Sequence, residues 1–304
     1  MKAFVLSDIH TDMWYCYAVK PSRLKGDDPK EDVVEDTLNH LWKFKDYPET
    51  DAIIVPGDVG NDFLTYTRTI TWLSKKYKQV YIVLGNHDVL ARGATPSQSN
   101  LQFHTSDDKV AALKAHAAQY PNVHLLDGDV HNGIGGTMGM CDLKCEVVPW
   151  RNIKFDWKKW FDGKHWKHYI SKDPEEIWNA EAEKMNKILE QKPKIVMTHF
   201  VPYEAGINWH YRNDPCNVFF YFNAEEFLDK MEDGTLWLCG HVHDKKIINW
   251  VNSSGKHITI LCNPSGYPGE GSMYADKADV EDGKLNRYSG TTEWSDFIID
   301  IPEE

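Results

Sequence analysis

Residues 80–88 read VYIVLGNHD, a short apolar run that ends in a cluster of polar side chains. Four other stretches have the same form, and in each of them the apolar run leads directly into Asp or His. They are KAFVLSDIH at 2–10, AIIVPGD at 52–58, IVMTH at 195–199 and LWLCGHVH at 236–243. Such a run before polar residues is typical of a buried strand that ends at a functional loop. The sequence therefore predicts buried strands whose ends carry chemically active groups.

Segments with helical spacing lie between these runs. We expect helices at 31–44, 64–77, 107–120, 173–191 and 224–231, and further strands at 258–262 and 297–301. Strands that alternate with helices indicate an α/β fold. Open α/β sheets gather their functional groups at the carboxyl ends of the strands. The polar residues after the predicted strands are therefore expected to meet at one edge of the molecule.

The chain has 304 residues, of which 41% are hydrophobic. This length suits one large domain, and we predict a single domain over residues 1–304 with a cap insertion at about 91–190. That interval contains the glycine-rich run 133–139 and the tryptophans Trp150, Trp157, Trp160, Trp166 and Trp178. We expect part of it to be scaffold helix and the Trp-rich part to overhang the active site. The acidic stretch 276–282 is expected to be a solvated loop.

The formal net charge of −12 bears on partners and on location. An acidic chain repels long polyanions, so sustained binding to duplex nucleic acid is not expected. The N-terminal residues do not form a signal peptide, and no apolar stretch reaches the roughly 18 residues of a membrane span. We therefore expect a cytoplasmic protein without membrane contact, whose oligomeric state is left open. Its cysteines are expected to be reduced, with a disulfide or metal clip at Cys141 and Cys145 as the alternative.

The polar residues at the predicted strand ends have the chemistry of metal ligands. They are Asp8, His10, Asp58, Asn86, His199, His241 and His243. Carboxylate, amide and imidazole donors suit divalent ions such as Mn, Fe, Zn, Co or Ni. Two such ions, two carboxylates and one bridging hydroxide leave a net charge of about +1, which attracts a phosphate anion. We predict two divalent metal ions, with Mn first among the candidates for activity in vitro.

The motifs together resemble those of a known family. In order they are Asp8-Ile9-His10, Gly57-Asp58, Gly85-Asn86-His87-Asp88, Thr198-His199 and Gly240-His241-Val242-His243, and they resemble the calcineurin-like metallophosphoesterase family. The resemblance covers most of the chain and implies a four-layer αββα sandwich with two mixed sheets.

The resemblance also implies roles for individual residues. Metal one would take Asp8, His10, His243 and the bridging Asp58, and metal two would take Asp58, Asn86, His199 and His241. His87 would protonate the leaving group, and Asp88 would orient His87.

Two positions depart from the family pattern. Many members continue the second motif as G-D-x-x-D, and the protein phosphatases add an Arg, whereas this chain has Asn61 and no Arg. This difference argues against a serine/threonine protein phosphatase. The segment 263–270 resembles a stretch after the last histidine motif, but Ser265 stands where other members often have Arg.

These observations predict a dinuclear metal-dependent phosphohydrolase. It would cleave a phosphomonoester or phosphodiester by attack of a metal-bridging hydroxide, with a small phosphorylated substrate such as a nucleotide. A nuclease that acts on short or single-stranded ends is the alternative within the same chemistry. A non-catalytic interaction module is the alternative of another class, because the family includes a membrane-trafficking scaffold subunit with a degraded site. The complete ligand set and His87 favour the enzyme.

Two further groups of residues are candidates for substrate contact. The segment 208–212 reads NWHYR, and we predict that His210 and Arg212 bind substrate, since Arg can hold phosphate oxygens in bidentate fashion. An aromatic anchor for an ordinary loop is the alternative there. Trp14, Tyr15 and Tyr17 can stack on a nucleobase or pack in the core, and we favour packing.

Overall fold

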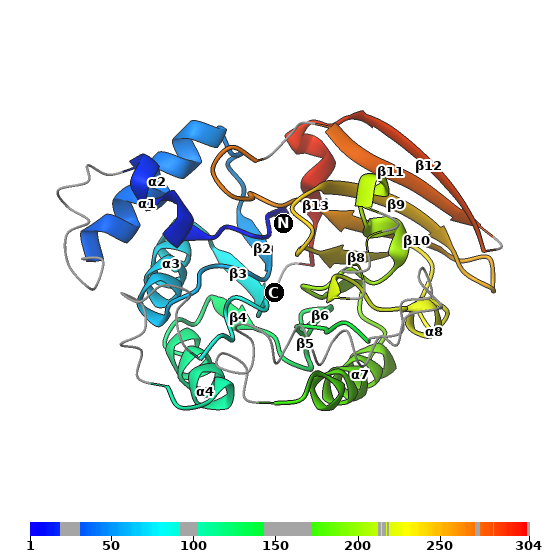
Figure 1. Ribbon diagram of the computed structural model, residues 1–304, viewed down its shortest axis with the longest axis horizontal. Helices are drawn as coiled ribbons and strands as arrows, with labels where there is room; N and C mark the ends of the chain where they lie inside the picture. The colour runs from blue at the N-terminus through cyan, green and yellow to red at the C-terminus, as the bar shows by residue number, and fades with distance from the viewer. Residues whose placement is uncertain are drawn as a thin grey trace.

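The computed structural model describes residues 1–18, 31–91, 103–142, 172–211, 214, 217, 219–270, 274–281 and 283–302. Its strands form one sheet of five strands, called here the first sheet, and one of eight, called the second sheet. Figure 1 shows the first sheet with helices α2, α3 and α4 on one side of the molecule, and the second sheet with α7 and α8 on the other.

The first sheet carries the N-terminal motifs. Its order is β13 (Ile298–Asp300), β1 (Lys2–Val5), β2 (Ala52–Pro56), β3 (Gln79–Val83) and β4 (Val123–Leu125). Strands β1 to β4 are parallel, and β13 runs antiparallel to β1. The helices of this half are α2 (Glu31–Lys45), α3 (Phe63–Lys76) and α4 (Ser106–Ala117), with the short η1 (Thr11–Trp14) and α1 (Tyr15–Ala18) after β1.

The second sheet carries the C-terminal motifs. Its order is β12 (Lys284–Thr291), β11 (Tyr274–Glu281), β9 (Lys245–Val251), β10 (His257–Cys262), β8 (Thr235–Cys239), β7 (Ile195–Met197), β6 (Ile134–Gly136) and β5 (Asp129–His131). The pairs β6–β7, β7–β8, β8–β10 and β9–β11 are parallel and the others antiparallel, so this sheet is also mixed. Its helices are α7 (Pro174–Glu190) and α8 (Glu225–Leu228).

Alternate residues of each central strand face two different cores. Ala52 and Ile54 of β2 belong to a cluster built from strand and strand-end residues of both sheets, whereas Ile53 and Val55 belong to a larger cluster that includes the helices. Side chains alternate across a strand, so the two sheets pack directly on each other and the helices cover their outer faces. The predicted αββα sandwich with two mixed sheets is confirmed.

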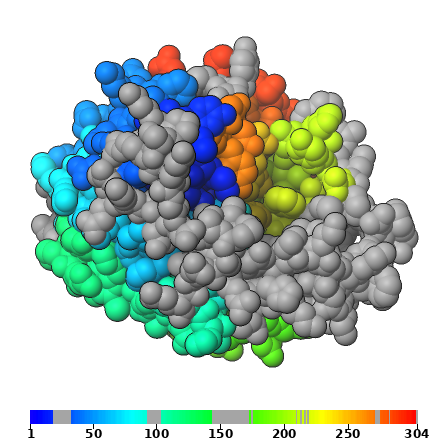
Figure 2. Space-filling model, turned by 60° about the vertical axis from the view of Figure 1, so that its left-hand side comes forward, coloured from blue at the N-terminus to red at the C-terminus, as the bar shows by residue number. Residues whose placement is uncertain are grey.

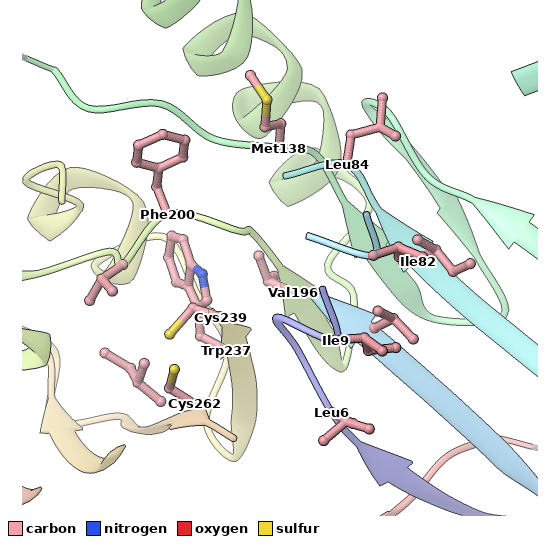
Figure 3. Packing of buried hydrophobic residues seen from close by; sticks show 14 of the residues in the cluster. Leu6, Ile9, Ile82, Leu84, Met138, Val196, Phe200, Trp237, Cys239 and Cys262 are labelled. Carbon is pink, nitrogen blue, oxygen red and sulfur yellow. The ribbon is translucent and has the colours of Figure 1, made fainter. Parts of the chain in front are cut away.

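Figure 3 shows part of the larger cluster, where Phe200 and Trp237 lie together beside Val196. The indole Nε1 of Trp237 donates to Thr198 Oγ1 at 2.9 Å, and both side chains are buried. Because the Trp237 ring is held by the core, this bond fixes Thr198 and with it the start of the loop that carries His199. A core aromatic thus positions a motif residue.

All predicted helices and strands are present, and their ends differ from the predicted ones by a few residues at most. The structure adds β4, β5, β6, β9 and β12, and it places β11 where a solvated loop was expected. Within β11, Ala278 and Val280 are buried and Asp279 between them is partly exposed. The alternation was hidden in the sequence by the acidic side chains on the outer face.

The described residues within the predicted cap insertion at about 91–190 are part of the scaffold, as was expected for part of this interval. The described parts of this interval form α4, β4, β5, β6 and α7, which belong to the sandwich. The glycine-rich run forms β6 inside the sandwich, where there is no space for a side chain at Gly135 or Gly136. A Cβ added at Gly136 would lie 2.6 Å from Val83 Cγ1, and one at Gly135 would lie 2.4 Å from Ile188 Cγ2.

The tryptophans of the interval divide into two groups. Trp178 lies on α7, and its ring centroid is 5.2 Å from that of Phe222, so it packs in the core. Trp150, Trp157, Trp160 and Trp166 lie outside the described residues, as does Cys145. The Trp-rich cap stays a prediction for that segment. Cys141 is a free, buried thiol, and Cys16, Cys239 and Cys262 are free as well.

Candidate metal centre

The seven predicted ligands come together where the two sheets meet. Asp8 and His10 follow β1, Asp58 follows β2 and Asn86 follows β3, while His199 follows β7 and the histidines at 241 and 243 follow β8. Two groups of potential ligands result: Asp8 with His10 and His243, and Asp58 with His199 and His241. Within each group the donor atoms lie within 4.8 Å of one another.

Neighbouring segments frame this centre on the surface. Figure 2 shows the N-terminal segment, in dark blue, beside the segment that follows β10, in orange. Backbone hydrogen bonds join these segments, since the N–H groups of Ser265 and Gly266 donate to the carbonyls of Ser7 and Asp8. The loop after β1 is therefore held between elements of both sheets.

The backbone of the centre is in an unfavourable conformation. Among the described non-glycine residues, eight have a positive φ, and five of these are predicted ligands: Asp8 (53°), His10 (43°), Asp58 (57°), His241 (73°) and His243 (52°). A left-handed backbone costs energy at residues with a side chain and persists only where the surrounding structure enforces it. The strain is concentrated where the side chains of both sheets converge.

His199 and Asp58 of the second group, together with Asn86, direct three donor atoms to one position. His199 Nε2 is 2.9 Å from Asn86 Oδ1 and 3.2 Å from Asp58 Oδ2. His199 Nδ1 lies 2.9 Å from the Pro56 carbonyl and donates to it, so Nε2 is the ring nitrogen that faces the centre. His241 is held the other way round: its Nε2 is 3.3 Å from the Phe219 carbonyl, which leaves Nδ1 to face the centre.

The first group has the same character. His10 Nε2 and His243 Nε2 are 3.1 Å apart, and carboxylate oxygens of Asp58 and Asp8 lie 3.6 Å and 3.5 Å from them respectively. His243 Nδ1 is 2.8 Å from Glu270 Oε2. A carboxylate behind a metal-binding imidazole fixes its tautomer and orientation. The sequence analysis missed Glu270, although it ends the segment 263–270 that resembled the family.

The pKa values of the candidate ligands are set by burial and by their contacts with one another. At Asp8 the hydrogen bond and charge of His243 outweigh burial and lower the pKa to about 2. At His199 and His243 the neighbouring carboxylates outweigh burial and raise the pKa to about 9. Burial prevails at His10 and His241, whose pKa values fall to about 3.

These residues fit a pair of divalent ions. Asp8 and Asp58 are at most 1% exposed, and neither forms an ion pair with lysine or arginine in the part of the chain that the structure describes. Buried carboxylates need a positive partner. Divalent ions would supply it, and the carboxylate, amide and imidazole donors are the types that such ions accept.

Close backbone approach completes the centre. A Cβ added at Gly85 would lie 2.1 Å from Asp58 Oδ1 and 2.5 Å from Asp58 N. No side chain fits between these two strand ends, so glycine at the start of the third motif permits Asp58 to reach both groups.

His87 lies beside the first group, with its ring centroid 4.9 Å from that of His10. The structure differs from the expectation that Asp88 orients His87. The Asp88 carboxylate instead accepts from the backbone N–H groups of Gly85, Asp58, Val59 and Gly60 at 2.8–3.1 Å.

Asn61 occupies the position expected of Asp88. Its Oδ1 is 2.5 Å from His87 Nδ1, and the residue is fully buried. The second motif had shown Asn61 only as a departure from the family pattern, since nothing in the local sequence links positions 61 and 87.

A cavity of about 280 Å³ adjoins the centre. It is lined by Ile207, Asn208, Tyr211, Asp214, Asn217, Phe220, Val242 and Asp244. The Phe220 ring centroid is 5.0 Å from that of His241, which places this cavity next to the second group.

The other candidate residues have different outcomes. His210 lies on η5 (Trp209–Tyr211), is exposed, and donates its backbone N–H to Asn208 Oδ1 at 2.9 Å. Arg212 lies outside the described residues. Trp14 is 2% exposed and donates to the Gly266 carbonyl, so packing is confirmed for it, whereas Tyr17 is exposed.

The fold and the site define a class of protein. Paired divalent-metal sites at the strand ends of a layered α/β sandwich are a means of cleaving phosphate esters. The chain belongs to the calcineurin-like phosphoesterase family, whose model matches residues 1–245, and it is therefore a metal-dependent phosphoesterase.

A solved structure supports the fold. The crystal structure of a phosphopantetheinyl hydrolase from Mycobacterium tuberculosis is similar, with a TM-score of 0.59 and 15% sequence identity over 88% of this chain and 90% of that one. At this identity the likeness extends to the fold alone. No curated protein matches the chain in sequence. Among the described helices, none has the length and apolar character needed to cross a membrane.

Proposed function

We propose that the chain is a dinuclear metal-dependent phosphohydrolase that cleaves a small phosphomonoester or phosphodiester, with nucleotides as the first substrate class to test. The observation that carries this proposal is the convergence of seven donor side chains from both sheets, with His87 beside them. A non-catalytic module has no use for a proton donor next to a full ligand set.

Each donor has a place in this proposal. Asp8, His10, His243 and the shared Asp58 would hold the first ion, and Asp58, Asn86, His199 and His241 the second. When bound, the ions lower the pKa of water towards about 7 and neutralise phosphate oxygens. Manganese is the first candidate among Mn, Fe, Zn, Co and Ni, and the free thiols of the described cysteines fit a cytoplasmic setting.

His87 would donate a proton to the departing oxygen. Its Nδ1 is engaged by Asn61, so Nε2 is the nitrogen available to the substrate. General acid catalysis contributes about 10²–10⁴-fold, and it matters most where the leaving group is a poor one.

The cavity beside His241 supports a small substrate. Tyr211 and Phe220 line it and offer faces for a flat ring. The carboxylates of Asp214 and Asp244 disfavour additional phosphates at this position. We place the leaving group here, with His210 and Arg212 of the same segment as proposed substrate contacts.

A substrate panel on metal-reconstituted protein tests the function. It contains p-nitrophenyl phosphate, its bis-ester, nucleotides, cyclic nucleotides, a phosphopantetheine ester and a single-stranded oligonucleotide, each with Mn and with Mn plus chelator. We expect chelator-sensitive turnover on a small ester. Cleavage of the oligonucleotide ends alone would indicate a nuclease, and no chelator-sensitive turnover on any member would indicate a non-catalytic module.

His87→Ala tests the proton donor. The variant should retain its metal content and lose about 10²-fold or more in kcat on phenyl phosphate, while turnover of 2,4-dinitrophenyl phosphate stays near that of the wild type. His40→Ala is the matched control, because His40 is exposed on α2. Equal turnover of both esters by wild type and His87→Ala would remove His87 from this role.

A further inference from the structure

A chain of hydrogen bonds runs from His87 away from the metal centre. Asn61 Oδ1 is 2.5 Å from His87 Nδ1. On its other side, Asn61 Nδ2 donates to Asp12 Oδ2 at 2.6 Å, and the backbone N–H of Asn61 donates to Asp12 Oδ1 at 3.4 Å. Asp12 lies on η1, directly after the first motif. Hydrogen bonds therefore connect His87, Asn61 and Asp12, which come from three separate segments of the chain.

The direction of the Asn61 amide follows from its partners. The two ends of an amide group have nearly the same shape, so hydrogen-bond partners decide which end faces where. Both carboxylate oxygens of Asp12 accept from Asn61, Oδ1 from the backbone N–H and Oδ2 from Nδ2, so the NH₂ group of Asn61 faces Asp12. The oxygen then faces His87, and His87 Nδ1 must donate to it. This arrangement selects one tautomer of His87 and leaves Nε2 free to donate a proton to the substrate.

The backbone of Asn61 is held as firmly as its side chain. Lys109 of α4 is fully buried, and its Nζ donates to the carbonyls of Asn61 at 2.7 Å and Leu90 at 2.9 Å. A lysine in the core is costly to bury unless its donors are used. Here they join the loop after β2 to the loop after β3, so the Asn61 amide has little freedom to rotate or shift.

We propose that Asp12 is a positioning residue for the reaction, which acts through Asn61 to fix the tautomer and the orientation of His87. The inference rests on the proposed function, in which His87 protonates the leaving group. Within the described part of the chain, the side-chain hydrogen bonds of Asp12 go to Asn61, so its proposed effect runs through the direction of one amide.

Three variants separate this role from a merely structural one. Asp12→Asn removes the acceptor-only partner, so the Asn61 amide can turn its NH₂ group towards His87. Asn61→Ala removes the amide itself. The reciprocal pair Asp12→Asn/Asn61→Asp keeps one amide and one carboxylate in contact and still presents an acceptor oxygen to His87. Asp46→Asn, at an exposed position, is the matched control for the change of carboxylate to amide.

The readout compares two esters at saturating Mn. With phenyl phosphate, whose leaving group needs a proton, Asp12→Asn and Asn61→Ala should each lose about 10²-fold in kcat with little change in KM. With 2,4-dinitrophenyl phosphate, which departs without a proton, kcat should stay within about threefold of the wild type. The reciprocal pair should recover most of the loss on phenyl phosphate. Metal content and thermal midpoint are measured for every variant.

The outcomes separate the inference from the function. If His87→Ala loses turnover of phenyl phosphate but Asp12→Asn and Asn61→Ala do not, the positioning role is wrong and the function stands. Equal losses on both esters, together with lost metal, would mean that Asp12 is only structural. Failure of the reciprocal pair to recover activity would overturn the orientation argument. If His87→Ala itself is unaffected on phenyl phosphate, the fault lies with the proposed proton donor.

Discussion

Asp88 holds two loops together through its carboxylate. It accepts from the N–H groups of Gly85, Asp58, Val59 and Gly60 and is fully buried. Burial and the charge of Asp58 raise the pKa of Asp88, and the backbone hydrogen bonds oppose this rise. The Asp88 carboxylate thereby fixes the backbone conformation around Asp58.

Asp88→Asn should therefore affect stability more than proton transfer. The amide keeps one acceptor oxygen and sets an NH₂ group against backbone donors, which should lower the free energy of unfolding by about 3 kcal/mol. Urea unfolding of the metal-loaded protein measures this. The ratio of kcat on phenyl and 2,4-dinitrophenyl phosphate should equal that of the wild type, and a changed ratio with unchanged stability would contradict the assignment.

Glu270 should affect the affinity of the proposed first site for its metal ion, because it contacts His243. It accepts from His243 Nδ1 and also from the backbone N–H of Tyr267. Loss of such an outer carboxylate typically weakens metal affinity 10–100-fold. Glu270→Ala should show this weakening at one of two Mn sites in a binding titration, with the exposed Glu281→Ala as control. Equal loss at both sites, or at neither, would argue against the pairing with His243.

At the scale of elements, Asp127 connects the helices of the two halves. It follows β4, and its carboxylate contacts Lys114 of α4 and Lys184 of α7, each at 2.5 Å. Burial alone would raise the pKa of Asp127, but the two lysines outweigh it and lower the pKa. A lowered carboxyl pKa contributes stability at neutral pH that is lost as the pH falls through the folded-state value.

Asp127→Asn should lower the free energy of unfolding by about 1 kcal/mol at pH 7, a modest value because both lysines are partly exposed. The difference from the wild type should shrink below pH about 4, where the unfolded carboxyl becomes protonated. Urea unfolding across this pH range provides the measurement. Asp51→Asn, which removes the surface pair with Lys78, is the control and should leave stability unchanged. A constant difference at all pH values would exclude the electrostatic cause.

The strands at the edge of the second sheet could not be predicted from apolar patterns in the sequence. Strands β11 and β12 pair along Tyr274–Glu281 and Lys284–Thr291 and carry many charged residues. Among residues 275–281 of β11, the buried ones are Ala275, Ala278 and Val280, too few apolar positions to mark a strand in isolation. The parallel pairing with β9 supplies the hydrogen bonds that make this segment a strand. Apolar runs predicted the central strands because those strands are buried on both faces.

At the scale of the whole molecule, the proposed ions would join the two sheets. The first sheet contributes the ligands up to residue 86 and the second sheet the three histidines after β7 and β8. Ions that bind the folded chain stabilise it by mass action, by about 4 kcal/mol at a free concentration of 1,000 times Kd. Metal removal should therefore weaken the contact between the two halves.

We expect chelator to lower the thermal midpoint by several degrees, and Mn to restore it in a concentration-dependent manner. His241→Ala should reduce the Mn-dependent shift, whereas His257→Ala, at an exposed position of β10, should not. Calorimetry with and without Mn provides the measurement. A midpoint that is insensitive to chelator would contradict the role of the ions between the sheets.

The sequence by itself predicted the seven candidate ligands, because each lies within a few residues of an apolar run and local order along the chain brings it to a strand end. The alternation of buried strands with helices predicted an α/β fold, and the resemblance to the family implied the αββα class. Tertiary structure alone decided which side chains support the ligands. Asn61 meets His87, and Glu270 meets His243, across separations of 26 and 27 residues.

Such partners leave no local pattern, because a hydrogen bond between two loops depends on where the sheets carry those loops and not on the residues between them. The same reason applies to Asp88, which stands next to His87 in sequence but points to the opposite side of the turn. Backbone donors gathered from two loops attract its carboxylate, and only the packed sandwich brings those donors together.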